Sequence, residues 1–293
     1  MRVAAIDVGS TATRLLICRV EEASGAVLSA SFPKVELELR FPVLAGEGVA
    51  QTGRISEPRA RELAECFRKI RMLLAVRRVE SHRAVATAAF RTAANAPEVV
   101  ELVQQASGIR IEVIPAAEEA RLSILPLIRE GFGEPGGVLL VDVGGLSTDL
   151  CLSLPTASEP TTWSFAVGTL RQSADEGFQE AQQQLSQAVG SIFARHHDIG
   201  FAAVGGSIHH IARLWGNESG ELTLRACCRC IAEAAPLGSG ERVRRWQLSA
   251  LRAETIVRAA RIYQLLLESA SRPSVSAPLA GVRYGLILSL LPA

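Results

Sequence analysis

Short apolar runs and helical patterns of hydrophobic residues succeed one another along the chain in two similar blocks. In the first block, β-type runs predict strands over residues 3–6, 13–20, 26–31 and 35–41. Apolar residues then recur at helical spacing from Ser56 to about Val76, with Ser56 as the N-cap and Pro58 in the first turn. The block therefore opens with a meander of strands that is followed by a helix.

Strands and helices then alternate up to residue 129. The pattern predicts a strand over 84–87, a helix over 97–106, a strand over 111–114 and a helix over 117–129. This order favours a partly parallel sheet and an α/β fold.

A second block follows the segment EGFGEPGG (130–137), whose glycines and proline mark the best candidate for a domain junction. We predict domains over 1–128 and 129–280. The expected elements of the second block are strands over 138–143, 149–154, 161–166 and 201–204, a helix through 175–195, and a mostly helical remainder from Ser207.

Composition fits two globular domains and argues against some classes of partner. The 293 residues are 48% hydrophobic, which is ample for two cores. The net charge of +1 argues against a protein that binds nucleic acid through bulk charge, so we expect no nucleic-acid partner. The first apolar run is broken at Asp7, too early for a signal peptide or membrane span, which favours a cytoplasmic protein without a membrane partner.

The six cysteines are expected to be buried or half-buried thiols. They include the cluster ACCRC (226–230), which has no partnering second pair of ligands elsewhere in the chain. The adjacent His209 and His210 point in different directions on a helix, so a shared metal site is not expected.

The two blocks also share a motif. DVGSTATRLL, from Asp7, and DVGGLSTDLC, from Asp142, coincide at five of ten positions and lie 135 residues apart. Each motif stands at the same point of a strand–turn–strand unit, which indicates a duplicated half.

Both motifs have the chemistry of a phosphate-binding loop. Glycine lets backbone amides turn inward and lets a phosphate oxygen approach without meeting a Cβ. The hydroxyls of Ser10, Thr11, Ser147 and Thr148 add donors. The predicted phosphate-binding residues are Gly9, Ser10, Thr11, Gly144, Gly145, Leu146 and Ser147.

Asp7 and Asp142 stand at the ends of their strands, where they are placed to hold a hydrated Mg²⁺. Leu146 occupies a position where a third small residue would be expected. The alternative interpretation is two ordinary tight hairpins, for which a single Asp-x-Gly suffices.

Further segments fit the same chemistry. VGGSIHHIARL (204–214) ends a strand in Gly205 and Gly206 and opens a helix at Ser207, whose free amides favour an anion; small residues for close packing are the alternative. In VATAAFRTAANA (85–96), Arg91 follows a strand and is able to contact phosphate, although a lone arginine is more often a surface charge.

The segment AAEEARL offers a base for the activation of water. Glu118 and Glu119 begin a helix, so that one carboxylate could act on a water molecule. On the pattern alone, the favoured interpretation is a pair of acidic residues that stabilise the helix N-terminus.

Together these motifs resemble the exopolyphosphatase and guanosine pentaphosphate phosphohydrolase (Ppx/GppA) family, of the acetate and sugar kinase, heat-shock chaperone and actin superfamily. The matching segments span nearly the whole chain in order: AAIDVGSTATRLLI, VATAAFRTAANA, IPAAEEARL, VDVGGLSTDL, SFAVGTLR, VGGSIHHIA and VSAPLAGVRYGLIL. The resemblance implies two ribonuclease-H-like (actin-like) domains with an interdomain cleft, and a C-terminal helix over 281–293 that packs back on the first domain.

The resemblance also implies roles for single residues. Glu119 would be the catalytic base, Arg91 a phosphate contact, and Asp142 and Asp149 metal or water partners. The reaction would be the Mg²⁺-dependent release of terminal phosphate from inorganic polyphosphate or guanosine pentaphosphate, with water attacking in line. Because dimers are common in relatives, a homodimer is an implied partner.

The chain departs from the family pattern inside the candidate site. Thr11 and Ala12 replace Asn and Ser, Leu146 replaces the third glycine, and Asp149 replaces glutamate. A leucine keeps its amide, so the loop survives if the φ of Leu146 is negative, whereas a positive φ would cost about 1–2 kcal/mol.

Two other functions stay open at this point. One is an impaired family member that binds phosphate or nucleotide as a sensor or partner protein. The other is an ATP-dependent kinase of the same superfamily, which the match of the glutamate helix to the hydrolase branch disfavours.

Overall fold

The computed structural model describes residues 1–20, 32–171, 177–216 and 220–291. The chain folds into two compact units. Unit 1 comprises Met1–Glu130 and Ala280–Ala293, and unit 2 comprises Gly131–Leu279. The predicted strand over 26–31 lies outside the described residues.

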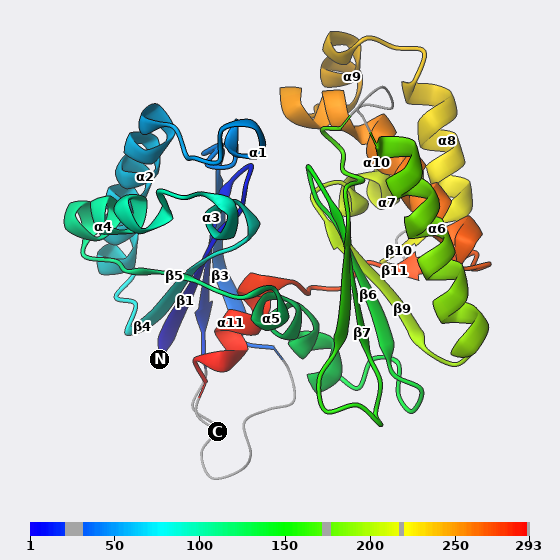
Figure 1. Ribbon diagram of the computed structural model, residues 1–293, viewed down its shortest axis with the longest axis horizontal. Coiled ribbons are helices and arrows are strands. Elements are labelled where there is room, and N and C mark those ends of the chain that lie inside the picture. The colour runs from blue at the N-terminus through cyan, green and yellow to red at the C-terminus, as the bar shows by residue number, and fades with distance from the viewer. Residues whose placement is uncertain (21–31, 172–176, 217–219, 292–293) are drawn as a thin grey trace. The chain divides into compact units, whose positions relative to one another are not determined.

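Unit 1 is built on a five-stranded sheet with the order β3-β2-β1-β4-β5 (Figure 1). The first three strands form an antiparallel meander, and β4 and β5 run parallel to β1. The strands are β1 (Arg2–Val8), β2 (Thr13–Arg19), β3 (Lys34–Phe41), β4 (Ser81–Ala86) and β5 (Ile111–Val113). The mixed sheet confirms the partly parallel arrangement predicted from the element order.

Helices cover both faces of this sheet. Alternate residues of β1 point to opposite faces, so that Ile6 packs with α2 residues such as Phe67, while Ala5 packs with Leu122 of α5 and Leu286 of α11. Burial of a leucine, isoleucine or phenylalanine side chain contributes about 1.5–3 kcal/mol to the stability of the fold. The helices of unit 1 are α1 (Val49–Thr52), α2 (Glu57–Val76), α3 (Ala88–Thr92), α4 (Ala96–Ser107), α5 (Ala116–Arg129) and α11 (Val282–Ser289).

Close contact between α5 and α11 depends on a glycine. A Cβ at Gly285 would collide with the carbonyl oxygen of Leu122, so only glycine lets the two helices approach this far. This contact ties the C-terminal helix to the sheet of unit 1.

Unit 2 repeats the same strand order. Its sheet runs β10-β11-β9-β6-β7-β8, in which β8-β7-β6-β9-β11 corresponds to the order in unit 1 and β10 is added at the edge. The strands are β6 (Val138–Val143), β7 (Thr148–Ser153), β8 (Thr161–Phe165), β9 (Gly200–Gly205), β10 (Glu221–Thr223) and β11 (Ser274–Ser276).

The core of unit 2 centres on the long helix α10. Its Tyr263 is completely buried and donates a hydrogen bond to the carbonyl of Val204 at 3.1 Å, which fixes α10 against β9. Ser249 caps the helix by accepting a hydrogen bond from the amide of Arg252. The helices of unit 2 are α6 (Phe178–Arg195), α7 (Ile208–Trp215), α8 (Leu224–Ala234), α9 (Ser239–Trp246) and α10 (Ala250–Ser269).

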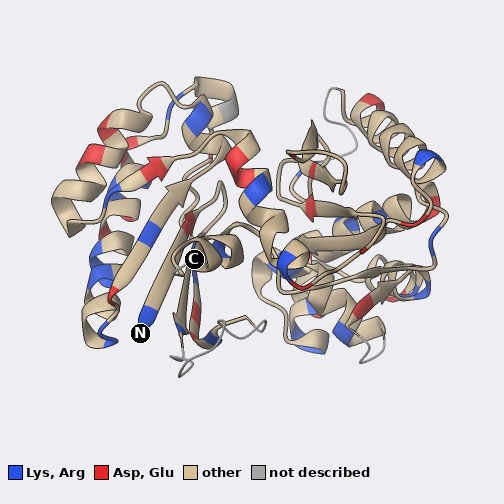
Figure 2. Cartoon of the chain, turned by 90° about the horizontal axis from the view of Figure 1, so that it is seen from below, with Lys and Arg blue, Asp and Glu red and all other residues tan. Residues whose placement is uncertain are grey.

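Charged residues of both signs lie on both units, and the prediction of buried or half-buried thiols holds for five cysteines and is wrong for Cys228. In the view of Figure 2, positive and negative residues are interspersed over both units. Five of the six cysteines are buried and Cys228 is exposed; burial raises the pKa of Cys18, Cys66 and Cys151 to about 12. No helix in the described parts of the chain is sufficiently long and apolar to span a membrane.

Candidate active site

Several predicted site residues of unit 1 follow the carboxyl ends of parallel strands. Residues 9–12, here called loop 1, follow β1; Arg91 lies on α3 after β4; and Glu119 lies in the first turn of α5 after β5. Since parallel strands end at the same edge of a sheet, these residues share one edge, the usual place of a ligand site in an α/β fold.

Loop 1 is a tight turn held by its carbonyl groups. The amide of Gly9 donates to the carbonyl of Ala12 at 3.0 Å, and the amide of Gly46 donates to the carbonyl of Ser10 at 2.9 Å. Within the described parts of the chain, the amides of Ser10 and Thr11 donate no backbone hydrogen bond. These two N–H groups are therefore available to an anion.

Loop 2, residues 144–147 between β6 and β7, has the same construction. The amide of Gly144 donates to the carbonyl of Ser147 at 2.9 Å, as Gly9 does to Ala12. The amides of Thr169 and Leu170 donate to the carbonyls of Gly144 and Gly145 at 3.0 and 2.8 Å. The amides of Gly145 and Leu146 take part in no backbone hydrogen bond with another described residue, so loop 2 also presents two N–H groups.

Leu146 does not force the turn into the left-handed region. Among the described residues other than glycine, φ is positive at Arg78, Gln247 and Ser271. The backbone of Leu146 is therefore unstrained, and its side chain is 43% exposed. The φ of Leu146 is therefore not positive, which is the case in which the sequence predicts that the loop keeps its phosphate-binding conformation.

One predicted phosphate donor is wrong. Thr148 is completely buried, and its hydroxyl donates to the carbonyl of Val167 at 2.6 Å, because the first residue of β7 faces the core. The hydroxyl of Ser147 donates instead to Asp149 Oδ2 at 2.9 Å.

The aspartates that precede the two loops have different neighbours. Asp7 lies directly opposite Arg14 in the β1–β2 pair, and Arg14 Nη1 is 3.5 Å from Asp7 Oδ2. Asp142 lies opposite Asp149 in the β6–β7 pair. The residue opposite the aspartate is thus an arginine in unit 1 and a second aspartate in unit 2.

The carboxylates that could hold magnesium lie at corresponding positions of the two sheets. Mg²⁺ prefers carboxylate oxygens and keeps several water ligands, so the facing Asp142 and Asp149 are sufficient protein ligands. Asp7 already has a guanidinium beside it, which disfavours a second cation. No cluster of three or more His, Cys, Asp or Glu ligands that could hold a metal ion lies within the described residues.

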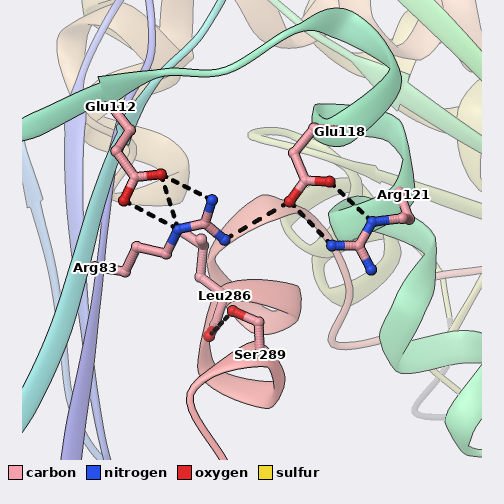
Figure 3. A network of polar contacts seen from close by, with 6 residues as sticks. All are labelled: Arg83, Glu112, Glu118, Arg121, Leu286 and Ser289. Atoms are coloured by element: carbon pink, nitrogen blue, oxygen red, sulfur yellow. Dashed lines mark hydrogen bonds and ion pairs between the residues drawn. The ribbon is translucent and has the colours of Figure 1, made fainter.

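The two glutamates of α5 have different surroundings. Arg91 Nη1 donates to Glu119 Oε2 at 2.6 Å and to the carbonyl of Ile114 at 3.1 Å, which fixes the arginine beside the glutamate. Glu118 instead accepts hydrogen bonds from Arg121 at 2.8 and 3.0 Å and forms an ion pair with Arg83 at 3.6 Å (Figure 3).

This network stabilises Glu118 as a carboxylate. Hydrogen bonds from Arg121, together with the charges of Arg121 and Arg83, lower the pKa of Glu118. Arg83 is itself bound to Glu112 at 2.8 Å, so Glu118 belongs to a chain of ion pairs on α5, β4 and β5. Of the two glutamates, Glu119 is the one that is paired with the predicted phosphate contact.

The third glycine turn of the chain, in unit 2, requires a glycine at position 205. Gly205 has a φ of +136°, and a Cβ there would lie 2.6 Å from the carbonyl oxygen of Val143. A Cβ on Gly206 would lie 2.9 Å from Nη1 of Arg252, and the same nitrogen donates to Ser207 Oγ at 2.9 Å. The turn therefore carries a guanidinium that the motifs did not indicate.

Two arginines that lie beside the candidate loops, Arg14 and Arg252, were not predicted from the sequence. Arg14 could have been found, because a hairpin closed by residues 9 and 12 places residues 7 and 14 opposite each other. Arg252 lies 45 residues after Ser207 on another helix, and no local pattern connects the two.

The comparisons with known proteins agree with these motifs. A model of the Ppx/GppA phosphatase family matches residues 28–293. The chain belongs to the Ppx/GppA phosphatase family. The resemblance inferred from the glycine loops and the glutamate helix is confirmed.

Solved structures show the same fold. The chain is 26% identical to the Aquifex aeolicus Ppx/GppA phosphatase, with a TM-score of 0.73 over 99% of this chain and 100% of the other. An exopolyphosphatase from Cytophaga hutchinsonii, 19% identical, gives a TM-score of 0.80 over 99% and 97% of the two chains. The prediction of two actin-like α/β units is thereby confirmed.

Proposed function

We propose that this protein is a Mg²⁺-dependent phosphohydrolase that releases terminal phosphate from inorganic polyphosphate or guanosine pentaphosphate. The observation that carries the proposal is the repeated loop geometry. In each unit, a strand whose second-last residue is an aspartate leads into a glycine turn. Carbonyl groups of the turn accept backbone hydrogen bonds, and two consecutive amides of the turn donate none to a described residue and could bind an anion. Membership of a phosphatase family supports the same reaction.

Glu119 is assigned the role of the base. It would accept a proton from the attacking water, and Arg91, fixed by Glu119 and by the carbonyl of Ile114, would hold the carboxylate in position and contact the phosphate. Fixed N–H groups stabilise the negative charge that develops on phosphate oxygens in the transition state. We assign this role to the amides of loop 1, loop 2 and Gly205–Ser207.

Magnesium is assigned to Asp142 and Asp149. A bound Mg²⁺ would neutralise charge on the phosphate oxygens. Asp7 is assigned a different part, since its pairing with Arg14 fixes that arginine beside loop 1.

The decisive experiment compares two adjacent glutamates. Phosphate release is measured for the whole chain with Mg²⁺ and either long-chain polyphosphate or guanosine pentaphosphate, in the wild type, Glu119→Gln and Glu118→Gln. The loss of a general base lowers kcat by about 10²–10⁴-fold, and we expect this only for Glu119→Gln. Chelation of Mg²⁺ should abolish the release, and added Mg²⁺ should restore it.

A different result would favour the non-catalytic alternative. If the wild type binds either substrate tightly but releases no phosphate from it, the protein is a binding member of its family rather than a hydrolase. Equal activity of Glu119→Gln and Glu118→Gln would remove Glu119 from the mechanism.

A further inference from the structure

A second arginine lies near loop 1, on the third strand of the meander. In the register of β1 with β2 and of β2 with β3, Asp7 lies opposite Arg14, and Arg14 lies opposite Arg40. The three side chains therefore form a row on one face of the sheet, with Cβ atoms of neighbours about 4.5–5.5 Å apart. The row stands at the end of the strands where loop 1 lies.

The guanidinium of Arg40 reaches the loop itself. Its Nη2 donates to the carbonyl oxygen of Thr11 at 3.4 Å, a long and therefore weak hydrogen bond. An arginine has five N–H donors, so this contact uses only part of its capacity.

The row carries an excess of positive charge. Arg14 is paired with Asp7, whereas no described carboxylate lies within 4.0 Å of Arg40. Glu38, two residues earlier on β3, is paired with Arg283 at 2.9 Å. The partial burial of Arg40 and the charge of Arg14 lower the pKa of Arg40. Like charges on opposite positions of a strand pair are destabilising, and an anion held by both guanidinium groups would offset this repulsion.

We propose that Arg40, together with Arg14, forms a second anion subsite beside loop 1 that binds the phosphoryl group next to the one released. The inference rests on the proposed function and makes it more specific. The ligand is a linear chain of phosphoanhydrides with at least two adjacent phosphoryl groups, whether inorganic or attached to a nucleotide. A planar guanidinium binds two oxygens of such a group at once.

The test uses Arg40→Gln and a matched variant, Arg61→Gln. Arg61 is an exposed arginine of α2 that forms an ion pair with Glu57, so its replacement removes the same charge from unit 1 outside the row. We expect Arg40→Gln to raise KM for the phosphate chain about 10-fold, with kcat changed less than about 3-fold. Arg61→Gln should leave both constants as they are in the wild type.

Product-like inhibitors separate the subsite from loop 1. Pyrophosphate can occupy both positions and orthophosphate only the first, so Arg40→Gln should weaken inhibition by pyrophosphate alone. A rise in KM confined to polyphosphate or to guanosine pentaphosphate would support the subsite and identify the chain that it holds. Unchanged KM and unchanged inhibition by pyrophosphate would overturn the inference, although the proposed function would stand.

A binding measurement covers the case in which the wild type releases no phosphate. Binding of inorganic tripolyphosphate to the wild type, Arg40→Gln and Arg40→Lys is then measured by calorimetry. Weaker binding by Arg40→Gln, with partial recovery in Arg40→Lys, would support the subsite in a non-catalytic protein. Equal affinities of all three proteins would disprove it.

Discussion

The backbone of Gly46 lies against Ser10, the second residue of loop 1. The amide of Gly46 donates to the Ser10 carbonyl at 2.9 Å, and a Cβ on Gly46 would lie 2.6 Å from Ser10 Cβ. Leu170 holds Gly145 of loop 2 through an equivalent bond of 2.8 Å. In each unit, an amide of the segment that follows the third strand of the meander (β3 or β8) thus donates to a carbonyl of the glycine loop. The loop's own amides remain available to a ligand.

We predict that Gly46→Ala damages phosphate release because the new methyl group must displace Ser10. The expected loss is about 10-fold in kcat/KM, with a destabilisation of about 1–3 kcal/mol. Gly48→Ala is the control: Gly48 has a φ of +73° and no atom near its Cβ position, so only stability should fall, by about 1 kcal/mol. Steady-state kinetics and urea unfolding measure both effects, and a fully active Gly46→Ala protein would refute the prediction.

Local patterns predicted the elements and the loops well, because both are encoded in short stretches. Strand β6 has the predicted bounds, and α2 begins after Ser56 and ends at Val76 as expected. The strands β10 and β11 have three residues each, too few for an alternating pattern to be recognised, and they were missed.

The contacts that position the site are of long range, and for this reason most were not predicted. Gly46 and Ser10 are 36 residues apart, and Arg252 and Ser207 are 45 apart. Neither pair belongs to one hairpin or one helix, so only the fold brings its members together. The sequence could not distinguish Glu118 from Glu119 without the family resemblance; in the structure Glu119 pairs with Arg91 and Glu118 with Arg121.

Replacement of Leu146 by glycine should bring little gain. Leu146 has no positive φ, and its exposed side chain leaves the turn unstrained, so the glycine relieves no conformational strain. We expect the affinity for inorganic phosphate to change less than about 3-fold and stability to fall by a few tenths to about 1 kcal/mol through chain entropy. A rise in affinity of 10-fold or more, measured by calorimetry, would show that the leucine side chain obstructs the anion.

Replacement of Arg252 should impair the third glycine turn. Its guanidinium donates to Ser207 Oγ and lies against Gly206, where it adds positive charge beside the predicted phosphate contacts. We expect Arg252→Gln to lower kcat/KM about 10–100-fold. Arg261→Gln, an exposed position of the same helix, should have wild-type kinetics. Equal kinetics of the two variants would exclude a functional role for Arg252.

Replacement of Glu118 should affect stability rather than catalysis. Its bonds to Arg121 and Arg83 lower its pKa, so the carboxylate stabilises the fold above its unfolded pKa near 4.5, and this contribution is lost as the pH falls through the folded value. Glu118→Gln should therefore lower the melting temperature by about 2–4 °C at pH 7. In thermal melts, the difference between the variant and the wild type should decrease as the pH falls below 4.5.

His210 should make the stability of unit 2 dependent on pH. Burial, followed by the charges of Arg252 and Arg213, lowers the pKa of His210 from 6.5 to about 4. Between these two pH values, His210 is protonated in the unfolded chain but neutral in the folded chain. The free energy of unfolding therefore decreases as the pH falls from 6.5 to 4, by less than about 1.4 kcal/mol per pH unit. His210→Gln should flatten this part of the curve in urea unfolding, whereas His209→Gln, at an exposed neighbouring position, should retain it. Identical curves for the wild type and His210→Gln would show that another group controls the dependence.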